Sequence, residues 1–266
     1  MRNHIMTRQL KRELNSFEGM WKGGYFEGNP LDPMSKSTYN TIGYMSVLHV
    51  VYLTCIKPYV TEKTVVLEIG PGRGAWTKTF LQAKEVWCLD ALSAEHNKFW
   101  EYIGNAQNVR YFQVTDFNCD ELPGNRFDYL FSFGTFCHIS FEGITEYMRN
   151  LYSKLKDGAD CFIMIADYQK FNSAIDNNEK LSVINVLRPK NRLKRWVWNL
   201  QWKLTKKYTI PNKRFPENED DTPSPGRWYH SGVERTCEML EKIGYKIIDP
   251  DVGAVHRDPI IHFKKE

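Results

Sequence analysis

Short apolar runs recur along the chain, separated by polar segments with helical spacing. The runs at 65–69, 85–89, 109–114, 127–132 and 160–166 are rich in β-branched and aromatic residues, which is typical of buried strands. Between them the pattern predicts helices over 74–83, 93–104 and 141–156. Because strands and helices alternate, we expect an α/β protein with a parallel sheet and helices on both faces.

The two ends of the chain depart from this alternation. A last helix over 232–243 precedes two strands, 245–249 and 259–264, whose connection is too short for a crossover helix, so they must pair antiparallel or lie apart. Before the first strand we expect a short helix over 6–17, an irregular Gly- and Pro-rich segment over 18–36, and a helix over 37–58. The alternation also breaks between 168 and 230.

The strand at 65–69 ends in a glycine-rich turn. Glu68 is followed by Gly70, Gly72 and Gly74, which is the arrangement that brings a ligand against bare backbone at a helix N-terminus. Gly70, Gly72 and Ala75 also satisfy the dinucleotide fingerprint, so the spacing alone leaves an NAD(P)-binding oxidoreductase open. Asp90 and Asp116 follow the next two strands. This ordered series of acidic residues favours a cofactor other than a nicotinamide dinucleotide.

This series resembles the first motifs of class I S-adenosylmethionine-dependent methyltransferases. Their first motif is an acidic residue followed by G-x-G-x-G, and here it reads E-I-G-P-G-R-G, from Glu68 to Gly74. The resemblance covers roughly 65–167. It implies a Rossmann-like seven-stranded, mostly parallel sheet with an antiparallel last strand, helices on both faces, an N-terminal helical cap and an insert after strand 5.

The resemblance also implies which residues hold S-adenosylmethionine and its product, S-adenosylhomocysteine. Asp90, followed by Ala91, would bind the ribose hydroxyls, and Asp116 with the Phe117 backbone would meet the adenine. The methionine part would face Glu68 and the backbone of Gly70 and Gly72, and its amino group the backbone of Phe133 and Gly134.

Two histidines are candidate bases for removing a proton from an acceptor hydroxyl. His138 follows the strand at 127–132 and His230 precedes the last helix. An imidazole can take a proton near neutral pH, which is the requirement for O-methylation. Side chains outside the predicted core are expected to bind the acceptor: Tyr25, Asn29, Tyr39, Arg227 and Tyr229.

Composition adds one strong charge feature. The stretch 188–214 holds ten Lys and Arg residues, no acid, and three interleaved Trp residues, although the whole chain carries only +4. Such a segment suits phosphate, a membrane surface or nucleic acid. We expect an anionic or phosphate-linked acceptor, with contact at the inner membrane face left open. RNA is the alternative partner, but the place after strand 4 reads S-F-G-T instead of the D/N-P-P-Y/F motif of amino-directed nucleic-acid enzymes.

The remaining sequence features concern the cellular location, the cysteines and the division of the chain into segments. No apolar run of 18 residues and no secretory leader occur, and the six scattered cysteines lack metal-binding spacing, so we expect a cytoplasmic protein with reduced thiols and no metal site. We expect one domain over 1–266: a cap (1–60), a cofactor-binding core (61–167), a basic Trp-rich insert (168–230) and a C-terminal helix and strand pair (231–266). Segments such as 90–102, 131–140 and 226–230 are similar to methyltransferases of bacterial capsule and surface-polysaccharide pathways, which implies methylation of a glycan hydroxyl or phosphoryl-type substituent.

Overall fold

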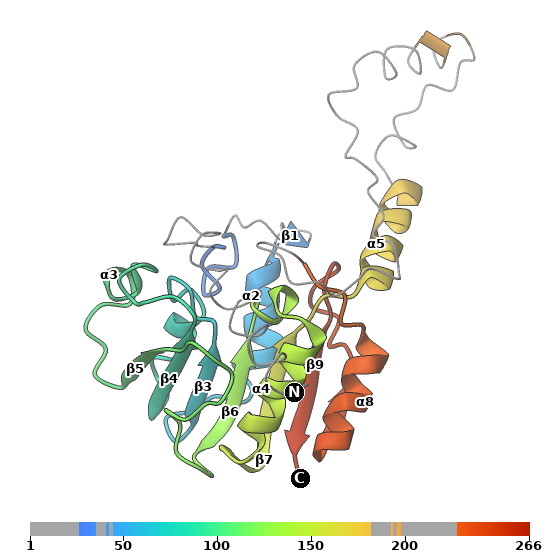
Figure 1. Ribbon diagram of the computed structural model, residues 1–266. Coiled ribbons are helices and arrows are strands. Elements are labelled where there is room, and N and C mark those ends of the chain that lie inside the picture. Colours follow the sequence, from blue (N-terminus) through green and yellow to red (C-terminus); the bar gives the residue numbers. More distant parts are fainter. Residues whose placement is uncertain (1–26, 36–40, 43–44, 182–192, 194–195, 198–227) are drawn as a thin grey trace.

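A seven-stranded sheet forms the centre of the molecule (Figure 1). The computed structural model describes residues 27–35, 41–42, 45–181, 193, 196–197 and 228–266. The strands of this sheet are β3 (Val65–Ile69), β4 (Glu85–Asp90), β5 (Val109–Gln113), β6 (Phe127–Ser132), β7 (Leu155–Met164), β8 (Tyr245–Asp249) and β9 (Ile260–Lys265).

The strands lie in the order β5-β4-β3-β6-β7-β9-β8. The first five strands in this order, β5-β4-β3-β6-β7, pair in parallel. Strand β9 is antiparallel to both of its neighbours, β7 and β8. The predicted Rossmann-like α/β fold with an antiparallel last strand is therefore confirmed. The chain moves outward from β3 to β5 and then returns to β6 on the other side of β3, so the sheet has a switch point between β3 and β6. Ligands of open α/β sheets bind beyond the carboxyl ends of the strands at such a point.

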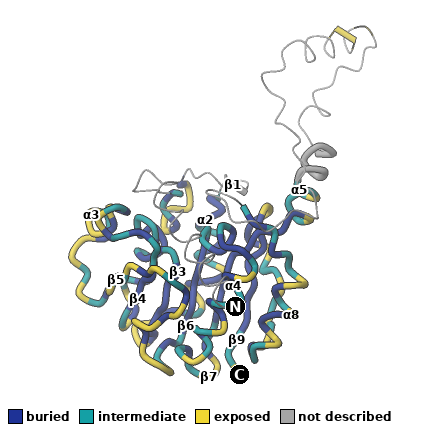
Figure 2. Tube along the Cα trace, viewed as in Figure 1, coloured by how far each residue is buried: buried dark blue, intermediate teal, exposed yellow. Residues whose placement is uncertain are grey.

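Helices cover both faces of the sheet, as predicted. On one face, α4 (Phe141–Tyr152) and α8 (Val233–Ile243) pack over the strand residues Leu67, Leu89 and Leu130. On the other face, α2 (Val47–Val51), η1 (Tyr52–Ile56) and η2 (Thr77–Phe80) pack over Val66, Val86 and Phe131. Because both faces are covered, every residue of β3 is buried, and Figure 2 shows burial concentrated on the sheet.

The helix predicted over 37–58 is wrong in its first half. Its described part begins with two short paired strands, β1 (Thr41–Ile42) and β2 (Met45–Ser46), before α2 and η1 continue to Ile56. The backbone N–H of Ser46 donates to Pro33 O at 2.7 Å, so it is bonded to the turn that precedes this stretch instead of to a preceding helical turn.

The helices after β3 and β4 are shorter than predicted. The range 74–83 contains only turns and the 3-10 helix η2, where Thr79 Oγ1 donates to Trp76 O and competes with regular helical bonding. The range 93–104 contains turns followed by α3 (Phe99–Ile103). Lys98 precedes α3 in a left-handed conformation, with a φ of 52°, which separates α3 from the turns before it.

The boundary between the next helix and strand also lies earlier than predicted. Helix α4 begins after Ser140, whose Oγ accepts from the Gly143 N–H, and it ends at Tyr152 instead of 156. Strand β7 begins at Leu155 instead of 160 because its first residues already pair with β6, across a register shift.

Some sequence predictions fall outside the described residues, namely the helix over 6–17 and nearly all of the basic stretch 188–214. A helix that was not predicted, α5 (Tyr168–Leu181), follows β7. Five of the six cysteines are buried and none is in a disulfide. In the part of the chain that the structure describes, no helix is long and apolar enough to cross a membrane. The division into cap, core, insert and C-terminal segments stays a prediction.

Candidate active site

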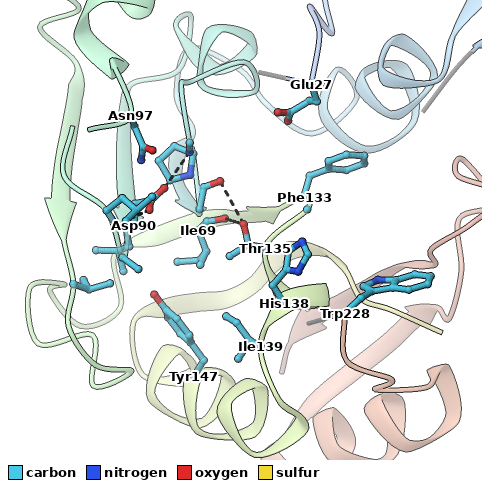
Figure 3. Close-up of a pocket in the computed structure, with 18 of the residues that line it drawn as sticks. Glu27, Ile69, Asp90, Asn97, Phe133, Thr135, His138, Ile139, Tyr147 and Trp228 are labelled. Carbon is cyan, nitrogen blue, oxygen red and sulfur yellow. Dashed lines mark hydrogen bonds between the residues drawn. The ribbon is translucent and has the colours of Figure 1, made fainter. Parts of the chain in front are cut away.

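A cavity of about 400 Å³ lies at the carboxyl ends of the central strands (Figure 3). Its walls come from the glycine turn after β3, the end of β4, the loop after β6 and the segments around Trp228 and Arg257. In Figure 3, Asp90 and Asn97 lie at one end, Trp228 at the other, and Thr135 and His138 between them. The sequence therefore brings residues more than 150 positions apart to one site.

The glycine turn is shaped by a neighbouring loop. Gly70 has a φ of +73°, which L side chains rarely adopt, and a Cβ there would lie 1.9 Å from Thr135 Oγ1. Thr135 Oγ1 also donates to the carbonyls of Ile69 and Gly70 at 3.3 and 3.4 Å. Glycine is thus required at position 70 by contact with Thr135, and the backbone of Gly70 and Gly72 borders the cavity.

Asp90 is fixed at the end of β4 by backbone donors. Its Oδ2 accepts from the Gly72 N–H at 3.1 Å, and its Oδ1 accepts from the Leu92 N–H at 2.9 Å. Burial raises the pKa of Asp90 from 3.8 to about 6, although these hydrogen bonds and the Asn97 amide lower it. A desolvated carboxylate facing a cavity is suited to accept hydrogen bonds from ligand hydroxyl groups.

Glu68 lies beneath the turn. Its side chain is buried and accepts from Thr77 Oγ1 at 2.7 Å, with the Cys88 thiol also in contact. Burial raises the pKa of Glu68 to about 8, with hydrogen bonds from Thr77 and Cys88 lowering it. Because Glu68 does not line the cavity, the structure gives it a role in supporting the turn, and the predicted contact with the methionine part stays untested.

Asp116 and Phe117 also lie away from the cavity lining. Both oxygens of Asp116 accept from Asn118, from its backbone N–H and its side-chain amide, so the residue closes an Asx turn. Phe117 is buried against Tyr147, and its carbonyl accepts from Asn150. From this strand end Val114 lines the cavity instead. The predicted adenine contacts therefore stay a prediction.

The loop after β6 supplies the opposite wall. Phe133, Gly134, Thr135 and His138 line the cavity, and Ser132 Oγ ties the loop to Ile69 O at 3.0 Å. His138 ends the short helix η3 (Phe136–His138), and its N–H donates to Thr135 O at 2.9 Å. The loop thus carries a histidine to the middle of the cavity on a turn that also contacts the glycine backbone.

The family follows from a sequence comparison made across two thirds of the chain. A family model described as a methyltransferase domain matches residues 32–207, which include β3 to β7 and the segment of the glycine turn. The chain belongs to this methyltransferase family. This match supports a methyltransferase and not the NAD(P)-binding oxidoreductase that the glycine spacing left open. No curated protein matches the chain.

Several solved structures are similar to this methyltransferase over most of its chain. A candidate S-adenosylmethionine-dependent methyltransferase from Listeria monocytogenes shares 14 % identity with a TM-score of 0.50, over 82 % of this chain and 99 % of its own. An S-adenosylmethionine-dependent methyltransferase from Aquifex aeolicus shares 16 % identity with a TM-score of 0.48, over 82 % and 98 %. Magnesium protoporphyrin IX methyltransferase from Synechocystis, in a structure with bound S-adenosylhomocysteine, shares 14 % identity with a TM-score of 0.46, over 82 % and 80 %.

The second candidate base of the methyltransferase, His230, is engaged elsewhere. Its Nδ1 accepts from the Tyr168 N–H at 3.1 Å, and its ring stacks on the Tyr168 ring. His230 does not line the cavity, so this position helps to attach the segment before α8 to the start of α5.

Of the acceptor-binding residues predicted for this methyltransferase, Tyr25, Tyr39 and Arg227 lie outside the described residues. Asn29 closes a turn, its Oδ1 accepting from the Leu31 N–H. Tyr229 is buried, and its N–H donates to Cys137 O. Neither Asn29 nor Tyr229 lines the cavity.

Sequence reasoning missed several lining residues of the methyltransferase, among them Glu27, Asn97, Trp228 and Arg257. Burial raises the pKa of Glu27 to about 7, although its own backbone N–H and the Trp76 indole lower it. Trp228 lies between two predicted positions, Arg227 and Tyr229, and Ala91 lines the cavity as expected for a residue next to Asp90. No local pattern marked Arg257. Among the described residues, no group of three or more His, Cys, Asp or Glu side chains is arranged to hold a metal ion.

Proposed function

We propose that this methyltransferase transfers the methyl group of S-adenosylmethionine to an oxygen atom of a glycan. The acceptor is a sugar hydroxyl or a phosphoryl-type substituent in a bacterial capsular or surface polysaccharide. The observation that carries the proposal is a single cavity with a ribose-type carboxylate, Asp90, at one end and a histidine, His138, in its middle. The sequence resemblance of the segments at 90–102, 131–140 and 226–230 supports the glycan.

The described residues fit S-adenosylmethionine. Asp90 presents two oxygens that backbone N–H groups hold in place, and the adjacent turn offers the bare backbone of Gly70 and Gly72. A cavity of about 400 Å³ is within the size range of small-molecule sites. Asp90 would accept from the ribose hydroxyls, and the backbone at Phe133 and Gly134 would border the methionine part. When bound, the cofactor supplies a methyl group on a positively charged sulfur.

The chain's own residues align the acceptor and remove its proton. Methyl transfer is an in-line displacement, so the walls contribute mainly by orienting the acceptor oxygen and excluding water. His138 would take the proton of the acceptor hydroxyl as the new O–C bond forms. The apolar lining residues Phe133 and Ile139 surround this position and reduce its access to water. A phosphoryl oxygen that is already ionised would need no such proton transfer.

An acceptor screen tests this proposal. The purified protein is incubated with S-adenosylmethionine and a panel of neutral, uronic-acid and phosphorylated sugars and oligosaccharides, together with RNA. Mass spectrometry then identifies products that have gained one methylene. Methylation of a sugar oxygen, lost in His138→Ala, is the expected result. Methylation of RNA alone would identify RNA, and not a glycan, as the acceptor. Binding of a nicotinamide coenzyme without S-adenosylhomocysteine binding would contradict S-adenosylmethionine as the cofactor.

A further inference from the structure

The far end of the cavity holds an arginine on an aromatic platform. Arg257 lies in the connection between β8 and β9, and its guanidinium carbon lies 4.9 Å from the centre of the Trp228 ring. Both residues line the cavity. Tyr168 and Phe171 from the start of α5 contact the Trp228 ring in turn, and the Tyr168 hydroxyl donates to the Trp228 carbonyl. The platform is therefore supported by packing and a hydrogen bond.

A buried carboxylate sets the orientation of this arginine. Arg257 Nε donates to Asp258 Oδ2 at 2.6 Å, and the Asp258 side chain is fully buried whereas the Arg257 side chain is 44 % exposed. Desolvation raises the pKa of Asp258 to about 6, and the neighbouring guanidinium lowers it. Bonding through Nε holds the plane of the guanidinium, and its two amino groups are the donors with which an arginine grips carboxylate or phosphate in a bidentate manner.

The backbone around Arg257 is anchored as well. Lys170 on α5 forms an ion pair with Asp251 at 2.5 Å, and its Nζ also donates to the Asp258 carbonyl at 3.5 Å. Asp251 Oδ1 accepts from the Gly253 and Ile260 N–H groups, which closes the ends of the loop. An arginine held in this way loses little side-chain entropy when it binds an anion. Its position therefore favours binding of an anionic ligand over the role of a solvated surface charge.

The charge along the cavity is asymmetric. Among the described residues that line it, Glu27 and Asp90 are acidic, and Arg257 is the only lysine or arginine. Asp90 lies at the opposite end from Trp228 in Figure 3, with His138 between them, and Glu27 lies near Phe133. A molecule that fills the space between His138 and Trp228 therefore meets a positive group on the side away from the proposed cofactor.

We propose that Arg257 and Trp228 form a subsite for a negatively charged group of the acceptor, a carboxylate or a phosphate. The inference rests on the proposed function, because it assigns the Asp90 end of the cavity to the methyl donor. Arg257 binds the oxyanion, Trp228 lies against the adjoining part of the acceptor, and the hydroxyl to be methylated faces His138. Neutral acceptors of the same shape bind more weakly.

Calorimetric titrations of the S-adenosylhomocysteine-loaded protein test the subsite with three probes of similar shape. Phenyl phosphate and benzoate carry the two possible anions, and benzamide is their neutral counterpart. We expect at least one anionic probe to bind at least about tenfold more tightly than benzamide, which is the preference expected for a charge-assisted contact. The stronger of the two anionic probes identifies phosphate or carboxylate as the natural group.

Variants connect this preference to the guanidinium. In R257Q the preference for the anionic probe should disappear while the affinity for S-adenosylhomocysteine stays within about twofold of wild type. Because R257Q leaves Asp258 buried without its partner, R257Q/D258N serves as a second variant that removes both charges, with the same expected result. The matched control is R110Q, since Arg110 lies over Trp87 at 4.7 Å outside the cavity, and it should keep the preference.

Three results would overturn the subsite. The first is the absence of any preference for an anionic probe, including no binding of any probe. The second is a preference that survives in the folded double variant. The third is a loss of S-adenosylhomocysteine affinity in R257Q with an unchanged probe preference, which would assign Arg257 to the cofactor's own carboxylate. Failure to bind S-adenosylhomocysteine would instead contradict the proposed function, and the probe titrations on the unloaded protein would still decide the subsite.

Discussion

Asp90→Asn should stabilise the cofactor-free protein at neutral pH while weakening cofactor binding. Burial raises the Asp90 pKa from 3.8 to about 6, so the folded protein holds an ionised carboxylate above pH 6 at a free-energy cost. The difference between the two pKa values corresponds to about 3 kcal/mol. Asparagine keeps only one acceptor oxygen for the Gly72 and Leu92 N–H groups, which costs about 1 kcal/mol or more.

The sign of the pH dependence follows from the raised pKa. Below pH 3.8 the carboxyl is protonated in both the folded and unfolded states, so it brings no penalty. As the pH rises toward about 6, the unfolded state ionises first and the stability of the wild type falls relative to the variant. Of the total ionisation penalty of about 3 kcal/mol, roughly 1.4 kcal/mol develops between about pH 5 and pH 7.5. This part corresponds to an increase of about 3 to 6 °C in the Tm difference between the variant and the wild type.

Thermal unfolding of the ligand-free wild type and Asp90→Asn, followed from about pH 5 to pH 7.5, measures this difference. The control Asp128→Asn removes a carboxylate that pairs with Lys156 at 2.7 Å, so it should lower the Tm at pH 7.5. Calorimetry on the same Asp90→Asn sample should show a loss of at least about tenfold in S-adenosylhomocysteine affinity, because an amide replaces the charged group that we propose as acceptor of the ribose hydroxyls. A Tm difference that does not widen with pH would contradict the burial argument, and an unchanged affinity would contradict the ribose assignment.

Three further substitutions test the turn, the base and the buried acid. His138→Ala should keep S-adenosylhomocysteine affinity but lose at least about a hundredfold in methyl-transfer rate, and a rate within a few-fold of wild type would exclude a base at this position. Gly70→Ala should reduce the free energy of unfolding in urea by at least about 1 kcal/mol more than Gly158→Ala. Both glycines have a positive φ, but only position 70 would clash, with Thr135, so equal losses would refute the close contact. Glu68→Gln should raise the Tm increasingly from about pH 6 to pH 8, because the Glu68 pKa of about 8 makes ionisation of this buried acid progressively unfavourable to folding. A Tm difference that stays constant over this range would show that Glu68 is not desolvated.

The strands of the fold were predictable because their pattern is local. Buried parallel strands such as Val65–Ile69 are almost entirely apolar, with Glu68 the exception in this strand, because both faces of the sheet are covered. Helix lengths were less predictable, since they depend on competing hydrogen bonds such as that of Thr79 with Trp76 O. The helix α5 had no strong apolar pattern in the printed sequence, and it was missed.

The candidate site shows the same division between local and distant information. Asp90 ends a strand and His138 follows one, so strand prediction, together with the rule that ligands bind at the carboxyl ends of the strands, placed them near the cavity. Asp116 also follows a strand end, but its carboxylate turns to Asn118, a choice that only the folded backbone reveals. Arg257 and Trp228 come from separate loops and meet only through tertiary packing, which no spacing in the sequence encodes.

The contact between Gly70 and Thr135 joins the two halves of the proposed reaction. Thr135 occupies the volume that any larger residue at position 70 would need, and its carbonyl holds the N–H of His138. A shift of the glycine turn, the proposed donor site, would thus be transmitted through one threonine to the proposed base. Attempts to redirect this enzyme to new acceptors would do best to leave Thr135 untouched and to vary the Trp228 end, which lies outside the contact between Gly70 and Thr135.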